Sequence, residues 1–209
     1  MDTFIFVLNM VGTLAFAASG AMIGLKKNMD IFGVCILGLT TATGGGVIRD
    51  LILGVTPPMA FRGPTAAIVA LVTSAVFFSR HVRRVLTHNQ RWYDLLLFWM
   101  DTLGLGVFSV IGVELAFSQA ERPTFFLLAF VGTLTGVGGG VLRDLLAQEM
   151  PYILVKHVYA CASLAGAAVC AGMWNHVDSV YAMLVGMATV VLIRALAAHY
   201  HWNLPKAKL

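Results

Sequence analysis

Two short segments combine three glycines with an arginine and an aspartate, a combination that could form a site inside a membrane. Residues 44–50 are Gly-Gly-Gly-Val-Ile-Arg-Asp, and residues 138–144 are Gly-Gly-Gly-Val-Leu-Arg-Asp. Each glycine costs a helix about 1 kcal/mol relative to alanine, so a triplet favours a break or kink. Backbone groups freed within a membrane persist only where protein buries them or a water-filled cavity hydrates them. The candidate kink and pore glycines are Gly44, Gly45, Gly46, Gly138, Gly139 and Gly140.

The alternative explanation of the glycines is close helix packing, because small residues let helix backbones approach. The charges that follow both triplets favour a functional site, since a charge inside a membrane is a functional hypothesis by default. Arg49, Asp50, Arg143 and Asp144 are these charges. Neighbouring residues point about 100° apart on a helix. Arg49 therefore need not pair with its neighbour Asp50. Because the two segments match, we hypothesise the cross pairs Arg49 with Asp144 and Arg143 with Asp50. These pairs could either clamp the two helices together or line a pore.

Two further stripes combine a polar residue, glycines and an aromatic ring. Asn9 and Phe16 lie on one helical face with two glycines, and Asp101 and Phe108 form the same pattern 92 residues later. A carboxylate deep in an apolar span is costly unless it faces water, a cation or a partner. The two phenylalanines could close a narrow passage, although aromatic residues at helical spacing are more often core.

Hydroxyl groups precede both triplets. Thr41 and Thr135 each lie three residues before the glycines, where they can bond to freed backbone or to a hydrated ion. Arg194, near the end of the last apolar stretch, is expected to extend its side chain to the membrane interface. The sequence contains neither His-Glu-x-x-His nor Gly-x-Ser-x-Gly, and we expect no enzyme activity, no cofactor and no metal site.

The elements that position these residues are membrane-spanning helices. Of the 209 residues, 59% are hydrophobic and 11% are charged, which excludes an ordinary soluble domain with about a quarter of its residues charged. A bilayer core takes about 20 apolar residues of helix. We predict an all-α membrane protein with seven transmembrane helices at approximately residues 3–25, 31–55, 63–79, 93–117, 124–147, 155–174 and 178–198.

The chain repeats itself internally. Residues 38–51 and 132–145 are identical at nine of 14 positions. A unit of three spans reverses its direction at the second copy, which predicts an inverted 3+3 repeat plus a seventh helix, with helices 2 and 5 kinked at the triplets. The expected parts of this one membrane domain are residues 1–91, 92–175 and 176–209, the last including a basic tail.

The loop charges predict the orientation. One side carries nine basic residues and the other only Arg62 and Arg122, so the positive-inside rule places the N-terminus outside and the C-terminus in the cytoplasm. The nine are Lys26, Lys27, Arg80, Arg83, Arg84, Arg91, Lys156, Lys206 and Lys208. The segment from Arg80 to Arg91 is predicted to be a solvated linker that determines topology, with a lipid site as the alternative. The net charge of +4 then indicates orientation and contact with membrane lipids, and no nucleic-acid partner is expected.

The doubled motif and the 3+3+1 pattern of spans resemble the bacterial branch of the trimeric intracellular cation channel (TRIC) family. The same bacterial sequences are also classed as a glycine-transporter domain family. The resemblance covers essentially the whole chain. It implies a homotrimer in the bacterial inner membrane, in which each protomer has a pore lined by helices 2 and 5 that conducts monovalent cations such as potassium.

Two departures limit the resemblance. Bacterial relatives often have an acidic residue where this chain has Asn9, and the animal channels have a Lys-Glu-Val signature where this chain has the glycine-Arg-Asp element. The alternative function is a secondary transporter of a small zwitterion such as glycine, because inverted repeats with interrupted helices are common in transporters. Seven spans leave little room for alternating access, which favours the channel.

Overall fold

A computed structural model describes residues 2–155 and 158–202, and these residues form helices joined by turns, without a strand. Five of the helices are long and apolar enough to cross a membrane. They are α1 (Asp2–Lys26), α2 (Ile31–Ile52), α5 (Gln90–Gln119), α6 (Phe125–Leu146) and α9 (Ser179–His199). Two shorter apolar helices are α3 (Thr65–Phe78) and α8 (Tyr159–Met173). The all-helical prediction is therefore confirmed, and each of the seven predicted spans overlaps one of these helices.

Three short elements connect the long helices: η1 (Met59–Phe61), α4 (Arg80–His88) and α7 (Tyr152–Val155). The segment that we predicted to be a solvated linker therefore begins with a helix, in which Val82 packs against a buried apolar cluster while Arg80 and Arg84 are exposed. Of the basic residues used to orient the chain, Lys156, Lys206 and Lys208 lie outside the described residues.

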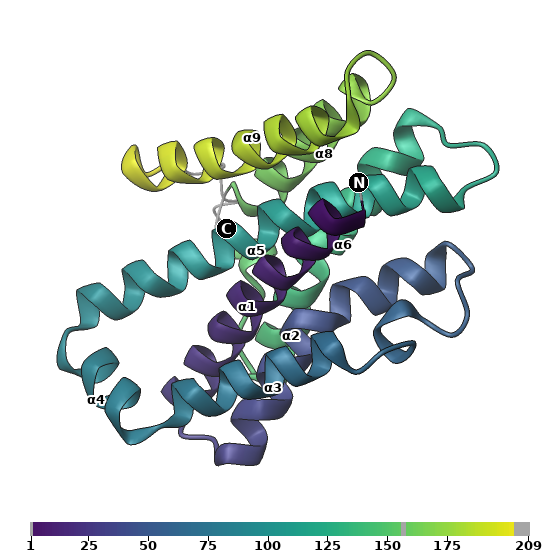
Figure 1. The fold of residues 1–209 in the computed structure, drawn as a ribbon. Coiled ribbons are helices and arrows are strands. Elements are labelled where there is room, and N and C mark those ends of the chain that lie inside the picture. The colour runs from purple at the N-terminus through teal and green to yellow at the C-terminus, as the bar shows by residue number, and fades with distance from the viewer. Residues whose placement is uncertain (1, 156–157, 203–209) are drawn as a thin grey trace, which may run out of the picture.

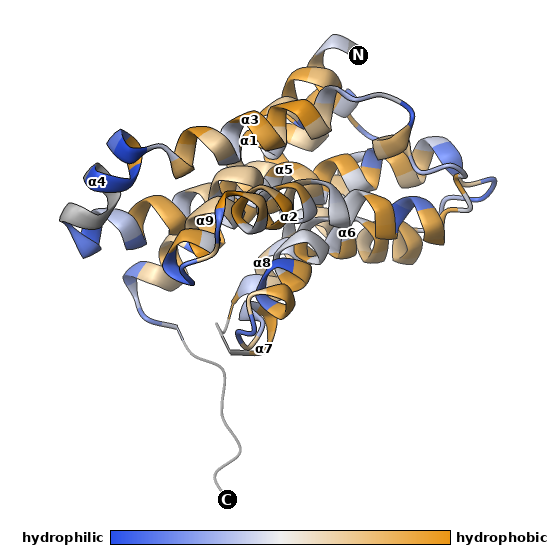
Figure 2. Ribbon diagram, turned by 90° about the horizontal axis from the view of Figure 1, so that it is seen from below, coloured by the Kyte–Doolittle hydropathy of each residue, from blue (hydrophilic) through white to orange (hydrophobic). Residues whose placement is uncertain are grey.

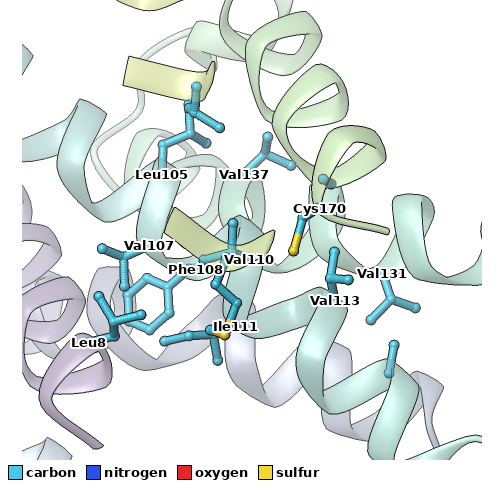
Figure 3. Close-up of a cluster of buried hydrophobic side chains, with 14 of the residues drawn as sticks. Leu8, Leu105, Val107, Phe108, Val110, Ile111, Val113, Val131, Val137 and Cys170 are labelled. Atoms are coloured by element: carbon cyan, nitrogen blue, oxygen red, sulfur yellow. The ribbon is translucent and has the colours of Figure 1, made fainter. Parts of the chain in front are cut away.

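The helices form one bundle in which α1 and α5 are central (Figure 1). Helix α1 contacts α2, α3 and α5, helix α6 contacts α2, α5 and α8, and α9 packs on α8 and α5. Helix α5 is the most enclosed of the long helices, with Leu105, Val110 and Val113 fully buried. Figure 3 shows these residues within the apolar cluster that holds α5 against its neighbours.

The outside of the bundle is apolar. Phe32 is 72% exposed and Phe126 is 76% exposed, although both are large hydrophobic side chains. Hydrophobic residues run along the long helices in Figure 2, whereas hydrophilic residues gather in α4 and the connecting turns. Hydrocarbon rather than water is the solvent that such a surface suits, which agrees with a membrane-spanning bundle.

Candidate functional site

The two glycine triplets meet where α2 crosses α6. Both helices are continuous through their triplets, so a break there is wrong, whereas the predicted kink stays a prediction. A Cβ atom on Gly45 would lie closer than 3.0 Å to the carbonyl oxygen of Thr135, and one on Gly139 would lie equally close to that of Thr41. These two contacts are equivalent under the repeat. The glycines therefore let two helix backbones touch, and this packing offsets their low helix propensity.

The space around the other four glycines of the triplets differs from one glycine to the next. A Cβ on Gly44 would collide with Leu142, and one on Gly140 would lie 2.8 Å from the hydroxyl of Tyr159. A Cβ on Gly138 would lie 3.0 Å from the Cα atom of Gly45. Gly46 differs, because the nearest atom to its Cβ position is on the flexible side chain of Arg49, at 3.5 Å. Position 46 therefore has room for a side chain.

The hydroxyl groups before the triplets are already bonded. Thr41 donates to the carbonyl oxygen of Leu37 at 2.6 Å, and Thr135 donates to that of Val131 at 2.7 Å. Both threonines are buried. Because the helices are unbroken, each hydroxyl bonds a carbonyl oxygen four residues earlier in its own helix and not a backbone group freed at the triplet.

The rings of Phe16 and Phe108 pack against each other beside this crossing. Their centroids are 5.3 Å apart and both side chains are buried. Phe16 also covers Gly104, and Phe108 covers Gly12, so each ring lies on the glycine of the other repeat. The structure thus places both phenylalanines in the apolar core between α1 and α5.

The first Arg-Asp pair lies in the last turn of α2. Nε and Nη2 of Arg49 are each 2.8 Å from Oδ1 of Asp50, and both side chains are buried. Oδ2 of Asp50 accepts a 2.7 Å hydrogen bond from the backbone of Met59. The pair therefore joins the end of α2 to the turn that follows it.

The second pair repeats this arrangement at the end of α6. Nε of Arg143 is 2.8 Å from Oδ1 of Asp144, and Oδ2 of Asp144 accepts a 2.9 Å hydrogen bond from the backbone of Tyr152. The two turns also share a helix-ending conformation, since Gly54 and Gln148 both have positive φ. The Arg-Asp element thus fixes the same helix-to-turn geometry twice.

The predicted cross pairs, Arg49 with Asp144 and Arg143 with Asp50, are wrong. Lys27, before α2, forms an ion pair of 3.1 Å with Glu149, after α6, so the end of α6 lies beside the start of α2. The two helices are antiparallel, and their last turns lie on opposite sides of the crossing. Each arginine is four residues beyond the central glycine, which separates the two pairs by about 12 Å along the helices.

The second repeat has a larger group of charged side chains than the first. This group, the charge centre, consists of Arg143, Asp144, Asp101 and Arg194. Nη1 of Arg143 lies 2.6 Å from Oδ1 of Asp101 and also donates to the hydroxyl of Ser19. Oδ2 of Asp101 is 3.2 Å from Nη2 of Arg194, which reaches in from α9. Asp101 thus has the partner that its burial requires, and it connects α5 to both α6 and α9.

Arg194 does not extend to the membrane interface as predicted. Its side chain is 7% exposed, its Nε donates to Thr102 at 3.2 Å, and its guanidinium carbon lies 4.8 Å from the ring centroids of both Phe98 and Tyr159. Sequence reasoning missed this role. The sequence feature that could have revealed it is Asp101, because a carboxylate deep in an apolar span needs a cationic partner from another helix.

The first half lacks this additional acid. Asn9, the repeat equivalent of Asp101, is half-buried near the start of α1. The described structure therefore contains two groups of charged side chains of different size, and one group lies on each side of the glycine crossing. Each group contains as many arginines as aspartates, so neither carries a net charge when all its members are ionised.

Known proteins resemble this chain along almost its full length. The family model described as "Glycine transporter" matches residues 6–81 and 98–175. The inner membrane protein YadS of Escherichia coli (strain K12) is 40% identical over 205 residues, covering 96% of this chain and 95% of its own. The membrane protein YvgT of Bacillus subtilis (strain 168) is 33% identical, covering 95% and 94%.

Solved structures share the fold. A TRIC cation channel studied for its conductance is 36% identical, with a TM-score of 0.85 and 97% of both chains covered. The TRIC trimeric intracellular cation channel orthologue from Rhodobacter sphaeroides is 33% identical, with a TM-score of 0.86, covering 96% of this chain and 100% of that one. A further TRIC structure at 16% identity and a TM-score of 0.60 shares the fold alone.

Proposed function

Because this chain belongs to the trimeric intracellular cation channel family, we propose that it conducts monovalent cations, potassium in particular, across a bacterial inner membrane. The structures at 36% and 33% identity are cation channels, and the likeness covers nearly the whole of each chain. One observation on this chain carries the proposal. Two antiparallel helices, α2 and α6, cross at glycine backbones with a neutral Arg-Asp group on either side.

The proposed path runs between α2 and α6 within each protomer of a homotrimer. The arginines on this path do not oppose cation passage, because every one of them is paired with an aspartate. This pairing removes the objection that buried arginines would repel potassium. Backbone carbonyls released when the two helices bend are oxygen ligands that could replace part of the hydration shell of an ion.

Opening of this path requires the crossing to loosen. The rings of Phe16 and Phe108 fill the space beside it, and the backbones at Gly45 and Gly139 touch the opposite helix. We propose that the two rings act as a gate and that α2 and α6 bend at their triplets, with Gly46 as the glycine that has space around it. Thr41 and Thr135 would then present their oxygens to the path.

The proposed topology has seven spans, an outside N-terminus and a cytoplasmic C-terminus. The five long and two shorter apolar helices support the number of spans. The separate matches of the family model to residues 6–81 and 98–175 support the division of the chain into two repeats and a seventh helix. The exposed Arg80, Arg83 and Arg84 of α4 suit an anionic cytoplasmic leaflet.

A flux assay tests this proposal. Purified protein is reconstituted into liposomes loaded with potassium chloride, and potassium efflux is followed with an ion-selective electrode after dilution into a potassium-free buffer that contains a protonophore, so that proton entry balances the charge that leaves. We expect fast efflux whose initial rate grows with the potassium gradient without saturating. Empty liposomes, and liposomes with the protein unfolded before reconstitution, are the controls. No efflux above these controls would contradict the proposal.

A carrier of glycine is the second candidate function. The description of the family model favours it, and so does one atom of the charge centre. Nη2 of Arg143 is buried and has no hydrogen-bond partner among the described residues, so it could donate to a carboxylate. Uptake of radiolabelled glycine into the same liposomes tests this candidate. Saturable glycine uptake without potassium efflux would favour the carrier over the channel.

A further inference from the structure

The seventh helix contributes a charge to the centre of the second repeat, although it belongs to neither repeat. Arg194 lies on α9, and its Nη2 is 3.2 Å from Oδ2 of Asp101. Its guanidinium is enclosed by Phe98 on α5 and Tyr159 on α8. The α9 side chain therefore closes one side of the charge centre, in a position fixed by contacts with two other helices.

Both oxygens of the Asp101 carboxylate are occupied. Oδ1 accepts from Arg143 at 2.6 Å and lies 3.4 Å from the hydroxyl of Tyr159, and Oδ2 accepts from Arg194. The carboxylate is 1% exposed. A cation could bind Asp101 only in competition with two guanidinium groups. The contact with Arg194 is the longer of the two and is the one that depends on α9.

The charge balance of this centre depends on Arg194. Arg143 and Arg194 carry two positive charges, and Asp101 and Asp144 carry two negative charges. Without Arg194, one negative charge would remain uncompensated in a buried site. A cation from solution can restore the balance, because an uncompensated buried charge is strongly disfavoured.

The first repeat shows what the charge centre is like without this addition. Arg49 pairs with Asp50 and Asn9 is uncharged, so that group is neutral without help from a further helix. Asp101 and Arg194 are therefore an extra pair of opposite charges, present in the second half only. The two Arg-Asp pairs otherwise match, since Asp50 and Asp144 each accept a hydrogen bond from a backbone amide of the segment that follows their helix.

We propose that Arg194 is a selectivity-setting residue, which keeps Asp101 from binding a permeating cation by occupying its Oδ2 atom. This inference rests on the channel function proposed above. The resting protein then has no fixed negative charge at this level of the path. Replacement of Arg194 by an uncharged residue should convert Asp101 into a cation site.

The test uses Arg194→Met, which keeps the length and apolar contacts of the side chain, and the double variant Arg194→Met/Asp101→Asn. Arg91→Met is the matched control, because Arg91 is an exposed residue at the start of α5, outside the charge centre. Permeability to potassium relative to chloride is measured from reversal potentials in planar bilayers. We expect it to rise by about tenfold in Arg194→Met, because one uncompensated charge acts on a nearby ion in a low-dielectric site. The double variant and Arg91→Met should match the wild type.

A binding measurement separates this inference from the channel proposal. The melting temperature of each variant is followed as potassium chloride is raised, with choline chloride as the control for ionic strength. Stabilisation by potassium in Arg194→Met, lost in the double variant, supports the inference even if no variant conducts. The absence of wild-type current contradicts the channel proposal alone. Equal potassium dependence in Arg194→Met and the double variant overturns the inference.

If Arg194→Met does not fold, Asp101→Asn tests the same balance with the opposite sign. This variant leaves one excess positive charge on the two arginines, so permeability to potassium relative to chloride should fall by a similar factor. An unchanged permeability ratio in a folded Asp101→Asn channel would also overturn the inference. A purely structural role of the Arg194 contact would lower stability without moving the ratio.

Discussion

Gly139→Ala should destabilise the protein, whereas Gly46→Ala should stabilise it or leave it unchanged. The two glycines belong to equivalent triplets of unbroken helices, so alanine brings the same gain in helix propensity, about 1 kcal/mol, at either position. Their surroundings differ. The new methyl group at position 46 meets nothing closer than 3.5 Å, and the atom it meets belongs to a flexible side chain.

At position 139 the methyl group would be closer than 3.0 Å to the backbone oxygen of Thr41 and 3.2 Å from the ring of Phe16. A backbone oxygen within a helix cannot rotate away, so α2 and α6 must separate. Overpacking of this kind costs about 1–3 kcal/mol. Because both variants gain the same helix propensity, that gain cancels in the comparison. The two variants should therefore differ in unfolding free energy by about 1–3 kcal/mol. A difference of this size corresponds to several degrees in melting temperature.

Thermal melting of the purified variants in detergent, followed by circular dichroism, measures this difference. Gly45→Ala should resemble Gly139→Ala, because its methyl group would meet the equivalent oxygen of Thr135. If Gly139→Ala melts as high as Gly46→Ala, the close crossing described here is wrong. Potassium efflux from liposomes gives a second result. Because Gly46→Ala adds no clash, a loss of efflux in this variant would report on bending of α2 rather than on packing.

Three other substitutions test single contacts by the same melting assay. Asp144→Asn should cost about 3–5 kcal/mol, because it removes one partner of a buried ion pair and weakens the hydrogen bond from the Tyr152 amide. A melting temperature equal to that of the wild type would refute the pairing. Phe108→Ala should cost about 3–5 kcal/mol through the cavity it leaves and should also speed potassium efflux; slower efflux in a folded variant would exclude the ring as a gate. Lys27→Ala should cost less than about 1 kcal/mol, because its ion pair with Glu149 is partly exposed; a larger loss would show that this contact holds α2 and α6 together.

The helices and the repeat could be predicted from the sequence, because both depend on local patterns. Apolar runs of suitable length mark the seven main helices, and the doubled motif marks the equivalent positions on α2 and α6. Helix α4 was missed because its charges masked a short amphipathic segment. In the structure Val82 packs inward while Arg80 and Arg84 stay exposed.

The contacts at the site could not be predicted, because they depend on how the helices cross. Helix propensity alone favours a break at Gly44–Gly46, but contact with the backbone of α6 keeps α2 continuous. The partners of Arg49 and Arg143 follow from the antiparallel crossing, which places the two last turns far apart. The role of Arg194 depends on where α9 docks, and no spacing within the sequence specifies that position.

The most direct test of the central claim is the reversal potential of single-channel currents in a planar bilayer containing the purified protein. With a tenfold gradient of potassium chloride across the bilayer, a cation channel should give unitary currents that reverse near the equilibrium potential of potassium. Raising the potassium concentration should increase the unitary current. Reversal at the chloride potential, or saturable glycine uptake by protein that gives no unitary current, would contradict the proposed function.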